Sequence, residues 1–406
     1  MMRSMFSGVS GLRNHQTRMD VIGNNIANVN TIGFKGSRVN FQDILSQNLQ
    51  GAAAPQGNRG GTNPMQVGLG MSVASIDTIF TDGSTQTTGK QTDLALQGQG
   101  FFIVNDGATS YYTRAGNFDF DTSGNYIVPG TGLKVQGWMG VNGVVNTTGP
   151  VGDIRIPVGI SMPATATTTV DFTKNLNAGA AVGTAFQNSV TVYDSLGTGH
   201  MIDVTFTKTA ANTWSWQASS GDTSITAGLP ATGTVSFNTS GGYTGMTGGP
   251  LNLTVTGAAG MTVAVNLSGI SQYTSESTIT GTSNGNASGT LETVTLDTSG
   301  VITGRFSNGL SRSLAQVALA TFNNAGGLLK AANNCYAASN NSGVAQVGTA
   351  NSGGRGSISP GSLEMSNVDL SQQFTDMIVT QRGFQANSKI ITTSDEMLQD
   401  LVNLKR

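Results

Sequence analysis

Side chains able to support metal or nucleophilic chemistry are scarce in this chain of 406 residues. It holds two histidines, His15 and His200, and one cysteine, Cys335. Metal centres and activated nucleophiles need several such groups at defined spacings, so both kinds of site are nearly unavailable. We expect His15 to fill an apolar seam, His200 to lie in a turn or at the surface, and Cys335 to be a small half-buried residue.

One acidic cluster has part of the spacing of a calcium loop. Asp119, Asp121 and Ser123 occupy alternate positions, but the distal glutamate and the flanking helices of such a loop are missing. The glycine-rich stretches also lack the strand, Gly-x-Gly-x-x-Gly and helix order of a nucleotide site. No paired carboxylates stand out. The sequence therefore predicts no metal site, no cofactor and no catalytic centre, and the secondary-structure elements must carry the function.

The composition is that of a large, weakly charged β protein. Charged residues make up 10%, aromatic residues 6%, and glycines number 56. Such chains are usually extracellular β proteins, repeats or disordered tracts, and regular apolar alternation argues against disorder here. The length allows two or three domains. A formal net charge of -2 gives no reason to expect nucleic acid or an anionic membrane as a partner.

The N-terminal sequence does not resemble a conventional signal peptide. Its opening residues, MMRSMFSGVSGLRNHQ, contain no continuous apolar core and no cleavage motif. No run approaches the ~20 apolar residues of a membrane span. A single cysteine also rules out a disulfide within the chain. An extracellular composition without an export signal favours a dedicated export route that leaves the N-terminus uncleaved.

Both ends of the chain carry apolar residues spaced seven apart. Seven residues make about two helical turns, so each stripe lies along one face of a helix and requires a partner. We predict that the two helices pair as a coiled coil and that both stripes pack against further copies of the chain. The predicted packing residues are Met5, Leu12, Met19, Ile22, Ile26 and Val29 at the N-terminus, and Leu363, Leu370, Phe374, Met377, Phe384, Ile391 and Leu398 at the C-terminus.

The ends and the charges of these helices can also be read from the sequence. The first helix is expected over residues 3–29, and Asn367 or Asp369 is expected to cap the start of the second. The first 40 residues hold five basic residues and one acidic residue, whereas residues 363–406 hold six acidic and four basic residues. This imbalance favours pairing of the helices within or between chains, or reflects two solvated faces that differ by chance.

Between the helices the sequence indicates β structure. We expect a terminal helical core (1–33 and 367–406), a linking arm (34–75), an inner β domain (76–149 and 304–366) and an inserted outer β domain (150–303). Within the arm, residues 41–49 are either a short helix or extended. In the outer domain, apolar residues alternate with period two, which predicts an antiparallel sandwich or barrel. Two Asp-Thr-Ser-Gly segments, at 121–124 and 297–300, are expected to form tight hairpin turns.

Residues at both ends resemble the signatures of the bacterial flagellar rod and hook family. Segments at 80–84, 97–102 and 401–404 fit the same family. The matches therefore span both termini and most of the inner region. The matching N-terminal residues are Asn24, Asn25, Asn28, Asn30, Thr31, Gly33, Phe34 and Lys35, and the matching C-terminal residues are Asn367, Asp369, Gln381, Arg382 and Asn387.

The resemblance implies an axial polymer subunit without enzymatic activity. Rod subunits of this family are shorter and lack a large inserted middle domain, whereas residues 190–197 with His200 resemble the opening hairpin of the hook subunit's outer domain. A hook subunit assembles into a curved, flexible tube that transmits torque from the rod to the filament as a universal joint. The implied partners are further copies of the chain, the flagellar rod, the hook cap, the hook–filament junction proteins and the flagellum's type III export apparatus. The implied location is extracellular, at the hook of the flagellar basal body.

Two other functions remain open at this point. The arm at 42–66 is long and resembles the insertion of the straight distal rod, so a distal-rod-type subunit is the first alternative. A secreted β-rich adhesin or enzyme of similar composition is the second, although it would leave both terminal signatures unexplained. Deletion of residues 1–30 separates these classes, because it should abolish polymerisation only in the axial proteins.

Overall fold

The computed structural model describes residues 2–55, 57 and 59–404, and the chain folds into two compact units. The first unit holds residues 2–157, 295–303 and 313–404, and the second holds Val158–Val294 and Gly304–Arg312. The chain is mostly β with a helix at each end, as the sequence predicts. No helix among the described residues is both long enough and apolar enough to cross a membrane.

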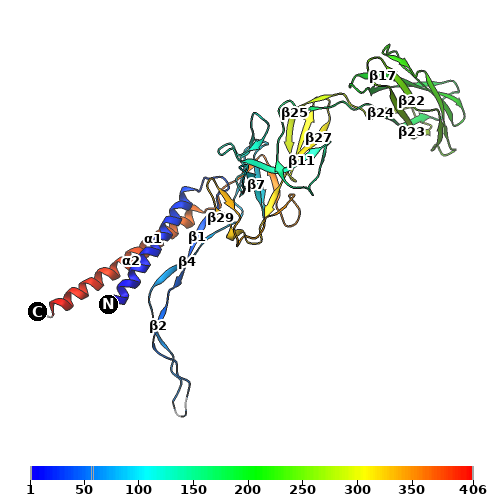
Figure 1. Cartoon of the computed structure of the whole chain (residues 1–406). Helices are drawn as coiled ribbons and strands as arrows, with labels where there is room; N and C mark the ends of the chain where they lie inside the picture. The colour runs from blue at the N-terminus through cyan, green and yellow to red at the C-terminus, as the bar shows by residue number, and fades with distance from the viewer. Residues whose placement is uncertain (1, 56, 58, 405–406) are drawn as a thin grey trace. The chain divides into compact units, whose positions relative to one another are not determined.

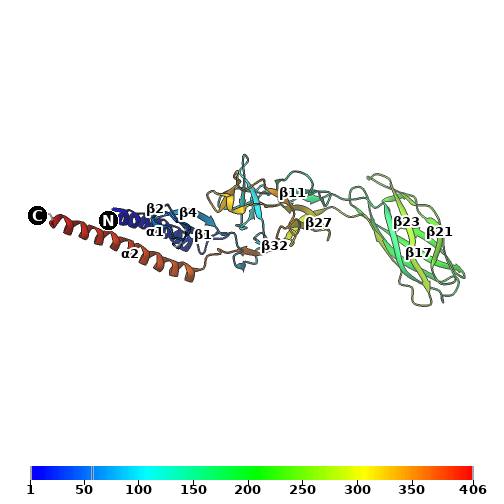
Figure 2. The same ribbon diagram turned by 90° about the horizontal axis from the view of Figure 1, so that it is seen from below.

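The terminal helices lie side by side (Figures 1 and 2). Helix α1 spans Met2–Ala27 and helix α2 spans Leu370–Asn403. The carboxylate of Asp369 caps α2 by accepting hydrogen bonds from the main-chain N–H groups of Ser371 and Gln372. The prediction that Leu363 belongs to the helical stripe is wrong, because it lies in a strand before this cap.

The linking arm is extended rather than helical (Figure 1). Strand β1 pairs antiparallel with β4, and β2 pairs antiparallel with β3. Both β2 and β3 are exposed along their whole length, so this ribbon has no core of its own. The bounds are β1 Ser37–Asp43, β2 Ser46–Gln50, β3 Met65–Gly68 and β4 Met71–Thr78.

The rest of the first unit is a β body around an aromatic core. Its main sheet contains the strand order β27-β11-β7-β8-β30-β29. The run Phe101–Val104 is buried throughout, because both faces of β7 are covered. The bounds are β5 Thr85–Thr87, β6 Leu94–Gln97, β7 Phe101–Asn105, β8 Ser110–Thr113, β9 Asp119–Phe120, β10 Tyr126–Ile127, β11 Lys134–Val141, β12 Val144–Val145, β13 Gly152–Asp153, β27 Ser311–Val317, β28 Leu319–Thr321, η1 Ala325–Gly327, β29 Leu329–Lys330, β30 Cys335–Ala337, β31 Gln346–Gly348, β32 Ser357–Pro360 and β33 Ser362–Glu364.

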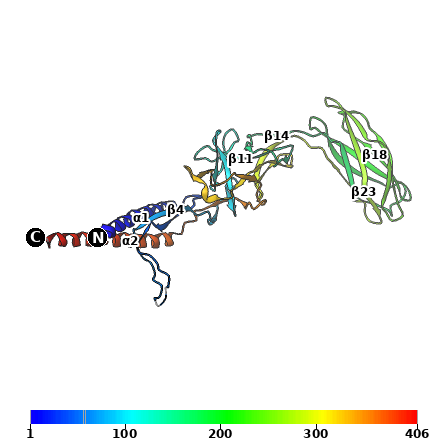
Figure 3. The ribbon, with the colours of Figure 1, turned by 60° about the horizontal axis from the view of Figure 1, so that its bottom comes forward.

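The second unit is a sandwich of two five-stranded sheets, ordered β19-β22-β23-β15-β24 and β16-β17-β18-β20-β21 (Figure 3). Alternate side chains of both sheets fill one core that includes Trp214, Trp216, Phe172 and Phe206. The sheets do not close into a barrel. The bounds are β14 Ser161–Met162, β15 Thr169–Asn177, β16 Ala185–Tyr193, β17 Gly199–Ala210, β18 Thr213–Ser219, β19 Ile225–Ala227, β20 Ala231–Phe237, β21 Tyr243–Thr247, β22 Leu251–Val255, β23 Met261–Tyr273, β24 Thr280–Ser283, β25 Gly289–Leu296 and β26 Val301–Phe306, the last two of which cross the unit boundary.

The sandwich is not purely antiparallel as the alternation predicts. Strands β15 and β23 run parallel. Period-two alternation reports which face of a strand is buried and carries no information on the direction of its neighbour. The long intervening segment, which contains β16 to β22, supplies the crossover that a parallel pair needs.

Four turns share one hydrogen-bond scheme. In each, the Oδ1 atom of an Asp or Asn accepts from the main-chain N–H groups two and four residues later, and the glycine three residues later has a φ between 75° and 86°. Both predicted Asp-Thr-Ser-Gly turns are of this kind, as are the connection of the hairpin at residues 190–200 and one turn that was not predicted from the sequence. The turns begin at Asp121, Asp194, Asn238 and Asp297, with glycines at Gly124, Gly197, Gly241 and Gly300.

Candidate functional site at the junction of the terminal helices

A buried cluster of charged side chains marks the point where both terminal helices leave the β body. The ammonium of Lys35, just after α1, lies 2.5 Å from Oε1 of Glu364, just before α2. Nη1 of Arg114 lies 3.4 Å from the other carboxylate oxygen of Glu364 and 3.3 Å from Oδ1 of Asp82. The side chains of Lys35 and Glu364 are fully buried. The cluster thus ties segments distant in sequence to one point.

Main-chain groups complete the coordination of these charges. Lys35 also donates to the carbonyl of Thr81 at 2.7 Å, and the N–H of Gly83 donates to Oε1 of Glu364 at 3.0 Å. Burial lowers the pKa of Lys35, because desolvation disfavours the ammonium, while the charge and hydrogen bond of Glu364 oppose this effect. A buried charge that lost its partner here would be left uncompensated, so the members of the cluster depend on one another.

Two asparagines clamp the helix ends next to the cluster. Oδ1 of Asn367 accepts from the N–H of Gly36 at 2.8 Å, and its amide donates to the carbonyl of Ile79 at 2.8 Å. Asn25, buried on α1, exchanges hydrogen bonds with the main chain of Ser37 and also donates to Gln373 of α2. Asn367 therefore fixes the entry to α2, although Asp369 rather than Asn367 is its N-cap.

Gly33 allows the chain to pass close to the β body after α1. Its N–H donates to the main-chain carbonyl of Glu364 at 2.8 Å, and its φ is +65°. A Cβ atom at this position would lie 2.4 Å from the main-chain nitrogen of Ala115. The next residue, Phe34, is buried, with the ammonium of Lys330 4.3 Å from its ring centroid. Only glycine satisfies both the conformation and the close approach.

Small and polar residues form the seam between α1 and α2. The fully buried residues of α2 are Thr380 and Ser394. A Cβ on Gly11 would lie 2.7 Å from the side chain of Asn387, and a Cβ on Gly383 would lie 2.6 Å from the ring of His15. His15 therefore does lie in the seam, as expected. The helices approach closely at these glycines. Ile391 of the predicted stripe also lies in the seam, because a Cβ on Gly8 would lie 3.1 Å from its side chain.

An ion pair at the same seam uses the unequal charges of the two helices. Nη2 of Arg18 lies 3.0 Å from Oδ1 of Asp376, and both side chains are partly exposed. Pairing of the basic first helix with the acidic second helix thus occurs within one chain. Because the pair is partly solvated, we expect it to contribute at most about 1 kcal/mol to stability.

Most large apolar side chains of α2 are exposed instead of buried. The seam covers Met377, Ile391 and Leu398 only in part. On α1, Ile22 is buried, and Met5, Leu12, Met19 and Ile26 are half-buried, as is Val29 just after the helix. The exposed apolar residues of α2, here called the α2 apolar surface, are Leu370, Phe374, Ile378, Val379, Phe384, Ile390, Met397, Leu401 and Val402.

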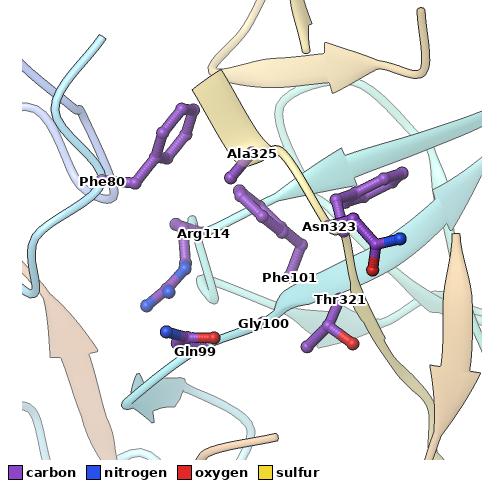
Figure 4. Close-up of a pocket in the computed structure, with 9 residues that line it drawn as sticks. Phe80, Gln99, Gly100, Phe101, Arg114, Thr321, Asn323 and Ala325 are labelled. Carbon is purple, nitrogen blue, oxygen red and sulfur yellow. The ribbon is translucent and has the colours of Figure 1, made fainter. Parts of the chain in front are cut away.

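A cavity of about 210 Å³ lies beside the charged cluster (Figure 4). Phe80, Phe101 and Arg114 line it, together with residues 99–100, 321–323 and 325. The guanidinium carbon of Arg114 lies 5.4 Å from the ring centroid of Phe101. Arg114 thus connects the cluster to the aromatic core of the β body. Within the described part of the chain, its Nε atom has no hydrogen-bond partner.

The structure brings about half of the family-signature residues together at the junction. Asn25, Gly33, Phe34, Lys35 and Asn367 meet there, and Asp369 caps the adjoining helix. Asn24, Asn28 and Thr31 bond to one another where α1 ends. Asn387 lies in the seam, whereas Asn30, Gln381 and Arg382 are exposed.

Sequence reasoning missed Glu364 and Arg114 as members of this site. Glu364 is the last residue of β33, and Arg114 directly follows β8. The available signal was their charge, because charged residues are rare in this chain and each of these stands beside buried positions.

Comparison with known proteins covers both helices and both units. Four family descriptions match: "Flagella basal body rod protein" over residues 5–35, "Flagellar hook protein FlgE/F/G D1 domain" over 95–175, "Flagellar basal body protein FlaE D2 domain" over 161–286, and "Flagellar basal body rod FlgEFG protein C-terminal" over 359–404. The flagellar hook protein FlgE of Borreliella burgdorferi is 44% identical over 445 aligned residues, covering 100% of both chains. The chain belongs to the flagellar hook protein family.

As a member of the hook protein family, the chain is a structural subunit of the bacterial flagellar hook. A rod-named relative, the flagellar basal-body rod protein FlgG of Bacillus subtilis, is 35% identical and also covers 100% of both chains. A large middle domain therefore does not by itself distinguish hook subunits from rod subunits, contrary to the argument made from the sequence. The higher identity to the hook protein favours the hook.

A solved structure of the same family shares the fold. The crystal structure of the Helicobacter pylori flagellar hook protein FlgE2 aligns with a TM-score of 0.55 at 15% identity, covering 67% of this chain and 98% of the other. At that identity the likeness concerns the fold alone. It agrees with the mostly β architecture described above.

Proposed function

We propose that this hook subunit self-assembles into a helical tube through the α2 apolar surface, which packs against terminal helices of neighbouring copies. The observation that carries this proposal is the exposure of nine large apolar side chains on one helix, with Phe374 51% and Ile378 58% exposed. Monomeric proteins rarely leave so much apolar surface on a single element in water. The seam inside one chain uses small residues, so the large ones remain available for neighbours.

The two ends of the chain then form the core of the tube, and the β units form its outer layers. The same surface patch cannot face itself in a tube that continues along an axis, so the contacts are heterologous and do not close. Under this proposal the residues 1–33 and 367–406 act together, 34–75 is the arm, and 76–149, 304–366 and 150–303 form the β domains. The tube bends and transmits torque from rod to filament as a universal joint.

This role implies specific protein partners within the flagellum. They are the rod below, the cap and junction proteins above, and the type III export apparatus that delivers the chain to the outside of the cell. The role is purely structural and needs no cofactor, nucleic acid or membrane. Support comes from the family membership and from the charged cluster, whose buried groups serve to anchor two helices.

The experiment combines two variants with electron microscopy. Phe374→Ser with Ile378→Ser removes two neighbouring members of the α2 apolar surface without adding charge. The control is Val344→Ser, which removes an 87% exposed apolar side chain from a loop of the β body. We expect the control to polymerise like the wild type and the double variant to remain monomeric in sedimentation, with unchanged helical circular dichroism.

The shape of the polymer decides between hook and rod behaviour. Short tubes that curve support the universal-joint role and show that the arm does not lock the polymer. Tubes that remain straight under all conditions would favour the distal-rod alternative, which the full-length match to the Bacillus subtilis rod protein keeps open. Polymerisation of the double variant at wild-type concentrations would overturn the proposed use of the α2 apolar surface.

A further inference from the structure

His200 is a buried histidine held between two aspartates, not the turn or surface residue that the sequence suggests. It stands near the start of β17 with 3% of its side chain exposed. Its Nδ1 atom lies 2.6 Å from Oδ2 of Asp222, and its Nε2 atom lies 3.4 Å from Oδ2 of Asp194. Only a doubly protonated imidazolium can donate to both carboxylates at once.

The other oxygen of each carboxylate is already used. Oδ1 of Asp194 accepts from the N–H groups of Leu196 and Thr198, and Oδ1 of Asp222 accepts from the N–H and hydroxyl of Ser224. Each Oδ2 atom is therefore left facing the ring. Among the described residues, Asp194 and Asp222 are the charged groups that pair with His200.

The residue types resemble a hydrolytic triad, but the geometry does not. The hydroxyl of Ser224 lies 3.1 Å from Nδ1, the same ring nitrogen that meets Asp222. A triad needs the hydroxyl and the carboxylate on opposite nitrogens, so that a proton passes through the ring. Here the second nitrogen faces a second carboxylate, so the ring acts as an ionic bridge.

The bridge joins two connections of the second unit to the start of β17. Asp222 lies in the connection from β18 in one sheet to β19 in the other. Asp194 begins the turn before β17, and this turn packs on the segments by which the chain enters and leaves the unit. A Cβ on Gly197 would lie 2.7 Å from Cβ of Ala164 and 3.2 Å from the main-chain nitrogen of Ser288. The Asp194 turn therefore packs on the segments around Ala164 and Ser288, which are here called the root of the second unit.

The two ring contacts are unequal, which decides what happens when a proton leaves. The Nδ1 contact with Asp222 is short, whereas the Nε2 contact with Asp194 is long. When the ring becomes neutral, the proton that remains is the one in the shorter hydrogen bond, on Nδ1. Nε2 is therefore the first nitrogen to lose its proton. Its lone pair then faces the Asp194 carboxylate, and attraction becomes repulsion.

We propose that the proton on Nε2 of His200 is a switch that locks the Asp194 turn against the entry and exit segments of the second unit. With the proton present, the root of the unit is rigid. Without it, the turn is released while the Asp222 contact persists. The second unit of a hook subunit would thereby change the stiffness of its attachment with pH.

The aspartates themselves stay ionised over the relevant range. Hydrogen bonds from Ser224, followed by that from His200, lower the pKa of Asp222 to about 2. Burial raises the pKa of Asp194, but the N–H groups of Thr198 and Leu196, together with His200, outweigh it, so this pKa is also lowered. Both aspartates therefore remain negatively charged near neutral pH.

The full-length chain offers a direct test by nitrogen NMR. It contains two histidines, so the signals missing from the variant His200→Gln belong to His200. We expect both ring nitrogens of His200 to be protonated in the locked state, and Nε2 to be the first to lose its proton when base is added. A ring that is already neutral at pH 6, or one that loses the Nδ1 proton first, would overturn the proposal.

Hydrogen exchange tests the mechanical consequence against a matched turn. The Asn238 turn has the same hydrogen-bond scheme without a histidine neighbour, so its amides correct for the intrinsic pH dependence of exchange. Between pH 6 and pH 9, we expect the amide protection of residues 194–198 to fall by about tenfold relative to that of residues 238–242. This figure corresponds to a ring proton that binds about tenfold more tightly when the turn is locked than when it is released. An unchanged ratio would contradict the switch.

The variant Asp194→Asn separates the switch from simple destabilisation. Asn238 shows that asparagine forms this turn with the same bonds. An amide at position 194 carries no charge, and its NH₂ group can donate to an unprotonated Nε2. The ratio of protection should therefore no longer fall as the pH rises, while the fold is kept. A ratio that still falls in Asp194→Asn would show that the ring proton does not act through Asp194.

Discussion

The ammonium of Lys35 and the carboxylate of Glu364 lie 2.5 Å apart in the first unit, fully buried, although 329 positions separate them in sequence. Each residue adjoins one terminal helix, so this contact holds both helices to the same β body. Arg114 supplies the second cation on Glu364. The buried pair is the central bond of the junction.

Removing one partner of this pair should be strongly destabilising. The variant Glu364→Gln leaves the buried ammonium of Lys35 without its counter-charge and Arg114 with Asp82 as its remaining ion-pair partner. We expect it to lower the free energy of unfolding of the first unit by about 3–5 kcal/mol. Chemical denaturation of the full chain measures this. The matched control is Asp119→Asn, which breaks an exposed pair with Lys90 of 2.8 Å and should cost less than about 1 kcal/mol. Equal effects of the two variants would mean that the cluster is not the anchor.

The seam glycines should be sensitive to a single methyl group. In Gly11→Ala the new Cβ would lie 2.7 Å from Asn387, so we expect a loss of about 1–3 kcal/mol and weaker helix pairing. The control is Gly23→Ala on the same helix, where no atom lies within 4 Å of the new Cβ. Because alanine favours helix over glycine, the control should gain up to about 1 kcal/mol. Thermal unfolding monitored by helical circular dichroism distinguishes the opposite signs.

Gly33 should tolerate no side chain. With a φ of +65° and a Cβ position 2.4 Å from the nitrogen of Ala115, Gly33→Ala combines backbone strain with a collision against main-chain atoms. Gly132→Ala is the control, because its φ is +72° but its Cβ position is open. We expect the control to cost about 1 kcal/mol and Gly33→Ala to cost clearly more. Comparable unfolding midpoints for the two would refute the close-approach argument.

Acid should weaken the second unit through Asp222. Folding lowers the pKa of this carboxyl from 3.8 to about 2, so its contribution to stability is fully present above pH 3.8 and is lost as the pH falls toward 2. Asp222→Asn should therefore remove part of the change in stability between pH 4 and pH 2. Fluorescence of Trp214 and Trp216, both in the core of the second unit, reports its unfolding. An identical acid transition in the variant would exclude this contribution.

Much of the architecture follows from local sequence. The seven-residue spacing predicts the two terminal helices, because a helix turn has a fixed length. The alternation around Trp214 and Trp216 predicts strands with one buried face, which the sandwich confirms. The Asp121 and Asp297 turns were predicted because the side chain, the main chain and the glycine of each turn lie within five residues.

Contacts between distant segments were decided by the tertiary structure alone. Period two cannot give strand direction, so the parallel pairing of β15 with β23 was missed. The position of Leu363 in a strand depends on where Asp369 caps the helix. His200 looked like a turn residue because its nearest neighbours are small and polar, and the loop carrying Asp222 closes over it only in the fold.

The sequence by itself indicated a helix with an apolar stripe at each end, because that depends only on helical periodicity. Six of the nine residues of the α2 apolar surface nevertheless lie outside the predicted stripe. The sequence could not determine which residues join the two helices within one chain. Seam packing depends on how closely two backbones approach, and Gly8 and Gly11 allow Ile391 and Asn387 of α2 to pack close to the backbone of α1. Most large apolar residues of α2 lie outside this seam, and only the tertiary structure shows that they are exposed.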